Sequence, residues 1–217
     1  VAASLTQPEG STTTMTTDKF GSVSKVTAPL GRVTTIQRDN FGNPVKITKP
    51  NGAVTLMTYD LKGNLLTMTE QGTTSSTTDD QTATFTYEPT YNQVKTILDP
   101  NGNINPATGV TTKIDYDLQG NPTLITDVYD TKTELKYDEP GSGHPTVKGL
   151  LTTSIAAKAL PEQATTTFRY ELALANLKDT TDPMLRLTSF TYDAAGTTNT
   201  TKVEGNDNNP ATDQLTT

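Results

Sequence analysis

The chain of 217 residues contains no cysteine, no tryptophan and a single histidine. Without cysteine, disulfide bonds and thiolate chemistry are excluded. The histidine, His144, lies in the polar segment 140–145, where neither a nucleophile nor an orienting acid stands at a recognisable spacing. Ser142 lacks the strand-turn-helix setting of a nucleophile elbow. We therefore expect His144 to be a loop residue, and we predict no catalytic residue and no enzyme.

Positive charge and long apolar runs are also scarce. Lys and Arg number 17 against 24 Asp and Glu, so the formal net charge is −7 and the pI is near 4.7. This balance disfavours binding to nucleic-acid phosphates. No run of 18 apolar residues is present, which predicts no membrane span, and there is no N-terminal signal sequence. Val1 is not an initiator Met and both ends stop within a repetitive pattern, so we expect a piece of a larger protein that is secreted or on the cell surface.

Sequence motifs for metals and cofactors are missing as well. Asp79-Asp80 and the segment 204–209 carry carboxylates that suit a hard cation such as calcium, but neither has the spacing of a helix-loop-helix calcium site. Solvated loops explain both better. Asn199-Thr200-Thr201 fits a glycosylation acceptor, although such a triplet arises easily in a threonine-rich chain. We predict no cofactor and no metal site.

What the chain has in abundance is threonine. Thr accounts for 47 residues, and its branched Cβ favours the pleated, half-wet surface of a β-strand. Hydrophobic residues are only 32% of the chain, which favours thin, one-layer walls with mostly polar faces over a thick core. Disorder is the competing explanation of such a composition, but regularly placed Tyr and Leu/Val/Ile residues argue against it.

An acidic residue recurs along the chain, and in six of its eight copies it directly follows a tyrosine. It falls at positions 18, 39, 60, 88, 117, 138, 171 and 193, so most steps are 21 or 22 residues and the longer ones carry insertions. A fixed period of about 20 to 50 residues indicates a repeat architecture. The structural repeat positions that we predict are Tyr59, Asp60, Gly63, Tyr87, Tyr116, Asp117, Gly120, Tyr137, Asp138, Tyr170, Tyr192, Asp193 and Gly196.

One unit has the length of a β-hairpin with its links. The Asp60 carboxylate can accept bonds from backbone amides two residues on, and Gly63 can take the positive φ that closes the turn. Asn commonly follows the glycine, and we expect it to tolerate left-handed geometry there, at Asn43, Asn64, Asn92 and Asn121. The aromatic residue before each acid is expected to lie over its neighbour's turn.

The strands between the turns alternate with a period of two. Leu66 and Met68 share one face while Thr67 and Thr69 take the other, and Val45 and Ile47 alternate likewise with Lys46 and Thr48. Second turns follow at Lys49-Pro50-Asn51-Gly52 and Asp99-Pro100-Asn101-Gly102. We predict an all-β fold of repeated antiparallel hairpins, with about fourteen strands, in a curled ribbon or part of a spiral β-shell. Longer loops are expected near residues 75–80 and 104–109, and short helical turns within 155–160 and 170–178.

The turns Tyr59-Asp60…Gly63-Asn64 and Tyr116-Asp117…Gly120-Asn121, with the second turns at Pro50 and Pro100, resemble the YD repeats of the Rhs family. This family includes polymorphic toxins, Tc toxin C components, wall-associated proteins and teneurins. The resemblance covers residues 17–196, and it implies a β-ribbon that spirals into a hollow shell around a C-terminal effector. Family shells end in a self-cleaving region with an Asp-Pro-x-Gly-Leu signature. Here Asn103 replaces that Leu and further repeats follow, so we expect an ordinary turn.

The chain is accordingly expected to be one continuous array over 1–217, with a repeat core at 17–196 and a polar, loop-rich end at 197–217. Its partners would be other repeats, of the same or a neighbouring chain, and an enclosed effector polypeptide, with no nucleic acid and no membrane span. Self-assembly through sheet edges is expected at the threonine-rich strips 11–17 and 197–202. Two functions stay open: a non-catalytic segment of a shell, or an extracellular adhesin or fibre module that binds carbohydrate or other subunits.

Overall fold

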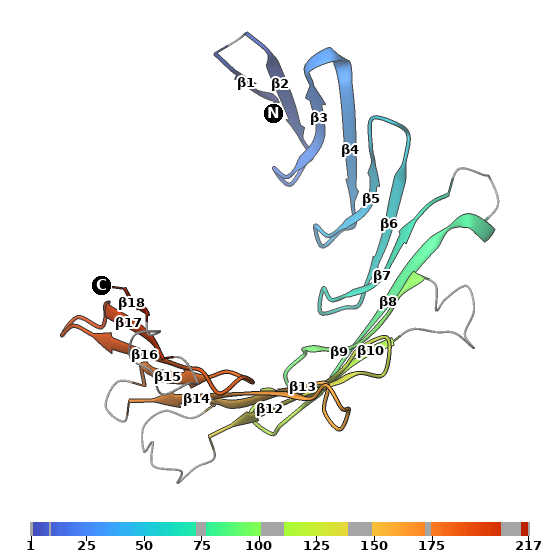
Figure 1. The fold of residues 1–217 in the computed structure, drawn as a ribbon. Coiled ribbons are helices and arrows are strands. Elements are labelled where there is room, and N and C mark those ends of the chain that lie inside the picture. Colours follow the sequence, from blue (N-terminus) through green and yellow to red (C-terminus); the bar gives the residue numbers. More distant parts are fainter. Residues whose placement is uncertain are drawn as a thin grey trace. The chain divides into compact units, whose positions relative to one another are not determined.

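The computed structural model describes residues 2–8, 10–72, 77–100, 111–138, 149–171, 175–204 and 214–216. The chain divides into two compact units, Val1–Thr111 and Thr112–Thr217. Both are built almost entirely from antiparallel β-strands (Figure 1). The all-β fold of repeated antiparallel hairpins is therefore confirmed.

In the first unit, each strand pairs with the one that follows it along the chain, so the nine strands form a meander. The strands are β1 (Ala2–Thr6), β2 (Thr12–Thr17), β3 (Val23–Ala28), β4 (Arg32–Arg38), β5 (Pro44–Thr48), β6 (Val54–Tyr59), β7 (Leu65–Glu70), β8 (Gln81–Tyr87) and β9 (Val94–Leu98).

The second unit repeats this plan. Its strands, the first of which starts at the boundary residue, are β10 (Thr111–Tyr116), β11 (Pro122–Thr126), β12 (Lys132–Tyr137), β13 (Leu151–Ala156), β14 (Ala164–Tyr170), β15 (Leu177–Thr181), β16 (Leu187–Tyr192), β17 (Thr198–Glu204) and β18 (Gln214–Thr216). The described residues thus hold 18 strands, more than the fourteen expected, and the sheet continues past residue 196 into the segment expected to be loop-rich.

Among the described residues, helix comprises two 3₁₀ turns, Pro29–Gly31 and Thr77–Asp79, and the single residue Pro100, which adjoins residues 101–110 outside the described part. The helical turn expected within 155–160 is wrong: Ile155 and Ala156 end β13, and Ala157 and Ala159 have φ of 50° and 65°. Left-handed φ values cannot continue a right-handed helix. In the other segment Leu177 already begins β15, while residues 172–174 lie outside the described residues, as do 104–109 and Asn101-Gly102.

Each unit has two chemically different faces, because side chains alternate along every strand. The registers place Met57 opposite Met68, and Thr58 opposite Thr67, as the alternation predicted. One face, which we call the apolar face, collects aliphatic, phenylalanine and repeat tyrosine side chains: Met15, Val26, Ile36, Ile47, Met57, Tyr59, Met68, Phe85 and Tyr87 in the first unit, and Ile114, Ile125, Leu135, Phe168, Tyr170, Phe190 and Tyr192 in the second.

The opposite face, the polar face, is lined by threonine and charged residues. Threonine hydroxyls bond across strands, with Oγ1–Oγ1 distances of 2.6 Å for Thr58–Thr67 and 2.8 Å for Thr69–Thr82. In the second unit Arg169 donates to both carboxylate oxygens of Asp179, at 2.7 and 2.9 Å. Leu56, Leu124 and Ile155 also lie on this face, opposite Lys46, Asp115 and Glu134 respectively. The expectation of mostly polar faces therefore holds for this face and is wrong for the apolar face.

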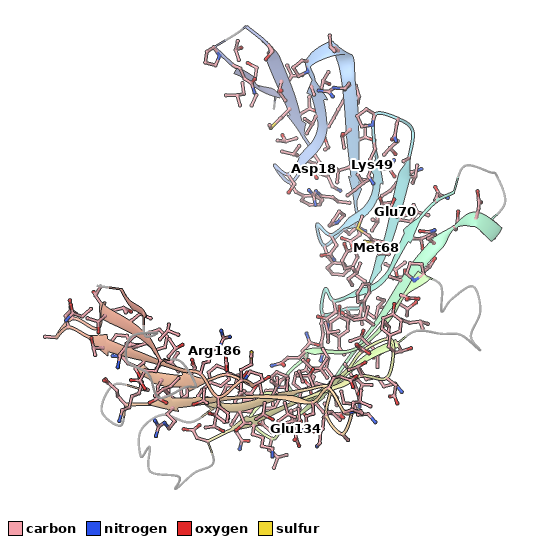
Figure 2. The ribbon with its side chains drawn as sticks, viewed as in Figure 1. Asp18, Lys49, Met68, Glu70, Glu134 and Arg186 are labelled. Carbon is pink, nitrogen blue, oxygen red and sulfur yellow. The ribbon has the colours of Figure 1, made fainter. Side chains whose placement is uncertain are left out.

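Neither unit has a buried core of the usual kind. Among the described residues, Ala83 at 8% is the one hydrophobic side chain classed as buried, and the buried polar residues are Thr55 and Asp179. Thr55 donates to Glu70 at 2.8 Å, and Lys49 lies 3.6 Å from the same carboxylate (Figure 2). A one-layer wall, as the composition predicted, leaves the apolar face half exposed.

The strips predicted to pair at sheet edges are wrong. Strip 11–17 lies in β2, which pairs with both β1 and β3, and strip 197–202 lies in β17, which pairs with both β16 and β18. Residues 14–16 of the first strip and 201–202 of the second are therefore paired on both sides, while Thr198 and Thr200 pair with β16. A high threonine content marks strands throughout this chain, so it does not distinguish an edge strand from an inner one.

Candidate functional site

The repeated acidic residues each follow directly after a strand and begin a turn. We call the residues from the acid to the next strand a YD turn, and the sheet edge where these turns lie the YD rim. In the copy at Asp60, the Asp60 amide donates to the Asn64 carbonyl at 2.9 Å and the Gly63 amide donates to the Asp60 carbonyl at 3.1 Å. The Asp60 Oδ1 atom accepts from the amides of Lys62 and Asn64, at 2.8 and 2.9 Å. The side chain thus replaces the backbone partners that the turn removes.

The same bonds recur along both units. Carboxylate Oδ1 atoms accept from the amides two and four residues on at Asp18, Asp39, Asp117 and Asp193. Gly63 and Gly120 both have φ of 87°, which confirms the predicted left-handed glycine. Glu88 receives the amides of Thr90, Tyr91 and Gln93, and Asp138 receives the Leu150 amide at 2.7 Å, across residues 139–148 that lie outside the described part.

The asparagine after the glycine has a different role from the one predicted. Asn92 has a positive φ of 59°, but Asn43, Asn64 and Asn121 do not. Instead, their Nδ2 atoms donate to the Oδ2 atom of their own turn's aspartate, at 3.1, 2.8 and 3.0 Å. The glycine already supplies the left-handed residue, so asparagine is selected by its side-chain donor. Asn64 and Asn92 also exchange amide bonds at 2.8 Å, which joins two successive YD turns.

These bonds favour the ionised carboxylate. The Asn64 side chain makes the largest contribution and lowers the pKa of Asp60; desolvation opposes it, and the backbone amides of Asn64 and Lys62 add to the lowering. For Asp117, desolvation opposes the shift, but bonds from Asn121, Gln119 and Gly120 outweigh it and the pKa is lowered too. Carboxylates bound in this way are charged at neutral pH and act as turn clamps, with their oxygens directed at the chain itself.

The tyrosine before the acid connects its turn to the preceding one. Tyr87 ends β8, and its hydroxyl donates at 2.9 Å to the carbonyl of Leu65, the first residue after the previous YD turn. Tyr170 donates in the same way to Leu151 at 2.9 Å, and Tyr192 to Leu177 at 2.7 Å. The tyrosines therefore reach the neighbouring repeat, as expected, and they do so through the hydroxyl group.

Three tyrosines also lie beside the acid of the preceding turn. Burial raises the pKa of Tyr59, Tyr137 and Tyr170, and the nearby carboxylates of Asp39, Asp117 and Asp138, respectively, add to the shift. A neutral hydroxyl is thus favoured at each position. Tyrosines and acids thus alternate as a ladder along the YD rim, and each of these tyrosines interacts electrostatically with the acid one repeat earlier in the chain.

Arg38 shows which kind of side chain is required at the position directly before the acid of a YD turn. It stands where most copies have tyrosine, and its Nη2 atom donates at 3.5 Å to the carbonyl of Val23, the first residue after the preceding YD turn. Its Nε atom lies 3.8 Å from Oδ2 of Asp18, the preceding acid. A long donor side chain thus makes both tyrosine contacts, and the copy at Arg38-Asp39, degraded in sequence, is complete in geometry.

A β-bulge accompanies every YD turn, and sequence reasoning missed it. The register shifts by one residue directly before positions 17, 38, 59, 87, 116, 137, 170 and 192. In the copy at Tyr59, Thr58 pairs with Thr67 but Tyr59 pairs with Leu65, so Leu66 is the extra residue. The asparagine four residues after the acid was the available signal, because a two-residue hairpin loop would need no bulge.

Two turns at the opposite rim have the same geometry and were also missed. Asp127 accepts from the amides of Tyr129 and Thr131, and Asp182 accepts from those of Met184 and Arg186, all at 2.8–3.0 Å. The left-handed positions are Asp130 and Leu185, with φ of 61° and 64°. An acid followed by a donor four residues on would have identified both, whereas a search for Gly could not. The predicted turn Lys49–Ala53 forms with Gly52 at φ of 85°.

The remaining candidates do not gather into a metal-binding group in the part of the chain that the structure describes. No group of three or more His, Cys, Asp or Glu lies close enough there to hold a metal ion. Asp80 accepts from the Gly72 amide at 2.9 Å, and the Asp79 carboxyl lies against Gly72. Glu204 pairs with Lys202 at 2.9 Å. His144, Ser142 and residues 205–209 lie outside the described residues.

With this geometry in place, the sequence can be compared with known families. Residues 18–54 match the family model described as RHS Repeat. This segment is similar to an RHS repeat. It includes the YD turns at Asp18 and Asp39 and the turn at Lys49, which confirms the resemblance predicted from the tyrosine-aspartate pattern. No curated protein matches the sequence.

Several solved structures are similar in fold. The TcdB2-TccC3 structure without its hypervariable C-terminal region has 14% identity and a TM-score of 0.46, over 94% of this chain and 13% of that one. The Photorhabdus luminescens Tc holotoxin pore gives 13% identity, a TM-score of 0.41, and coverage of 94% and 14%. A porin-like protein from Bacteroides uniformis gives 14%, 0.39, and coverage of 99% and 92%.

Proposed function

We propose that this chain is a non-catalytic wall segment of an Rhs-type shell that encloses or presents another polypeptide. The observation that carries the proposal is the half-exposed apolar face of each one-layer sheet. Antiparallel sheets ordinarily pack one face against a core. Here the described residues place phenylalanine, tyrosine and isoleucine side chains on one face and supply no second layer to cover them. An enclosed chain would complete that burial.

The YD ladder supports the same function. A wall that holds cargo must keep its width and register over many hairpins without a core. Acid-clamped turns fix each hairpin, and hydroxyl bonds such as that from Tyr192 to Leu177 fix each turn to the one before. The two units use the same turn, which supports a single continuous array over 1–217. Secretion or surface display is part of the proposal, and no helix in the described residues is long and apolar enough to cross a membrane.

Photo-crosslinking in the full-length protein tests which face meets a polypeptide. A benzophenone amino acid is placed at Phe168, on the apolar face, and at Thr167, its neighbour on the polar face, as the matched control. Cross-links from position 168 to a segment outside the repeats, and none from position 167, are the expected result. Equal cross-linking from both positions, or cross-linking from 167 alone, contradicts the proposal.

An interaction module is the second candidate, because large apolar side chains stand exposed on turn tips. Phe41 is 81% exposed and Tyr129 is 85% exposed. Exposed aromatic rings of this kind can stack on sugar rings or on partner side chains. Binding to a glycan array that is lost in Phe41→Ala, with no cross-linking from position 168, would favour the adhesin over the shell.

A further inference from the structure

The exposed apolar side chains at the turns form two rows. On the YD rim of the first unit, four successive turns each present one: Phe20, Phe41, Leu61 and Tyr91. On the opposite rim of the second unit, three successive turns, β11–β12, β13–β14 and β15–β16, also present them: Tyr129, Leu160, Met184 and Leu185. Aligned large apolar residues on a water-facing rim indicate an interaction surface.

Both rows have the same pitch. Successive turns on one rim of a meander are separated by two strands, which is about 9.6 Å at the usual strand spacing. A row with this pitch is best matched by another row of hairpin turns, whose side chains can fit between its own. The described part of the chain provides both halves of such a match, one in each unit.

The charges at the tips are complementary. Lys19 and Lys62 stand exposed beside Phe20 and Leu61 on the first row. Asp130 and Glu162 stand exposed on the second row. Asp130 lies 4.0 Å from Lys132, so Glu162 is the acid of this row that carries the charge argument. Arg186 pairs with Asp182 at 2.6 Å, and Lys158 with Glu134 at 2.7 Å.

We propose that a second copy of this chain docks with the opposite rim of its second unit on the YD rim of the first unit. The four aromatic and four aliphatic side chains can bury on the order of 1,000 Å², the size at which an interface becomes specific. The two surfaces differ, so the contact is head to tail and leaves the complementary row of each copy open to a further copy. Assembly then proceeds through rims, and it leaves the apolar faces and the edge strands unused.

Leu61 and Leu118 provide a matched pair of variants. Both follow the acid of a complete Tyr-Asp-Leu turn, at 95% and 88% exposure, but Leu118 belongs to neither row. In sedimentation equilibrium over a concentration series, Leu61→Ser is expected to weaken association about tenfold, the effect of losing one buried leucine. Leu118→Ser is expected to leave association unchanged. Far-UV circular dichroism serves as the control and is expected to show the same strand content in both variants.

Charge exchange tests the orientation. Lys62→Glu and Glu162→Lys are each expected to weaken association, and the double variant is expected to recover part of the loss. A strictly monomeric chain, or equal effects of Leu61→Ser and Leu118→Ser, overturns the proposal. Association that Leu61→Ser leaves intact also overturns it, because pairing through edge strands would then account for assembly.

Discussion

Removing one tyrosine hydroxyl measures how strongly a repeat is tied to its neighbour. Tyr87→Phe keeps the ring on the apolar face and deletes the 2.9 Å bond from its hydroxyl to the Leu65 carbonyl. A typical intramolecular hydrogen bond contributes about 0.5–1.5 kcal/mol net. Tyr87 is half-buried, so water partly replaces the lost donor. We therefore expect the free energy of unfolding of the first unit to fall by about 1 kcal/mol, and its melting temperature by a few degrees.

The control is Tyr129→Phe, which removes a hydroxyl from a turn tip that is 85% exposed. Urea unfolding followed by circular dichroism gives the stability of both variants, and amide hydrogen exchange locates the change. Tyr87→Phe should speed exchange in the turn from Asp60 to Asn64, one repeat away from the substitution. If Tyr87→Phe and Tyr129→Phe have the same stability, or if exchange changes only beside residue 87, the ladder does not connect turns.

Further predictions concern the turns themselves. Gly63→Val should destabilise the first unit by about 1–3 kcal/mol, because a β-branched residue resists the φ of 87°. The added Cβ itself has room, since the nearest side-chain atom would lie 3.9 Å away. Urea unfolding measures the loss of stability, and a loss no larger than that of Gly63→Asn would contradict the prediction. Asn121→Ala should raise the pKa of Asp117 by removing the 3.0 Å side-chain bond, as carboxyl titration by NMR would show. Stability should hold from neutral pH down to about pH 4 and fall below it, because a carboxyl with a lowered folded pKa stabilises above its unfolded pKa and loses that effect as pH falls through the folded value. On the alkaline side, burial and the nearby Asp138 carboxylate raise the folded pKa of Tyr170. Its contribution to stability is therefore complete below the ordinary tyrosine pKa of 10.0 and is lost as pH rises through the folded pKa, so absorbance titration of tyrosine should coincide with unfolding of the second unit.

The sequence predicts the turn positions well because the clamp is local. An acid, a glycine three residues on and a backbone amide four residues on are all within one turn, so the turns at Asp18, Asp39, Asp60, Asp117 and Asp193 could be located without tertiary information. Glu88 and Glu171 lack that glycine, and the repeat period and the preceding tyrosine located them. The same locality explains why the role of Arg38 could not be predicted. Its equivalence to tyrosine depends on Val23, fifteen residues earlier, and only the paired strands bring the two together.

The features that could not be predicted from the sequence depend on the register between paired strands. The bulge at Tyr59 and the apolar face are properties of strand pairs, and composition alone suggested polar surfaces on both sides. The edge strips failed for the same reason, because threonine favours strands wherever they lie in the sheet. At Asp130 and Leu185, the backbone accepts residues that rarely take positive φ, since the Asp127 and Asp182 clamps hold those turns closed.

Because a bulge recurs at every second turn, the repeat array can change its length only by whole hairpins. Each bulge adds a residue beside a YD turn on the strand that leaves it, so the two rims are not equivalent and the pattern returns to phase only after two strands. An insertion in a loop leaves this phase intact, whereas gain or loss of a single strand would send every later YD turn to the wrong rim and every later tyrosine away from its partner. Such a wall can therefore be lengthened or shortened by recombination only in whole hairpins, while its loops vary freely.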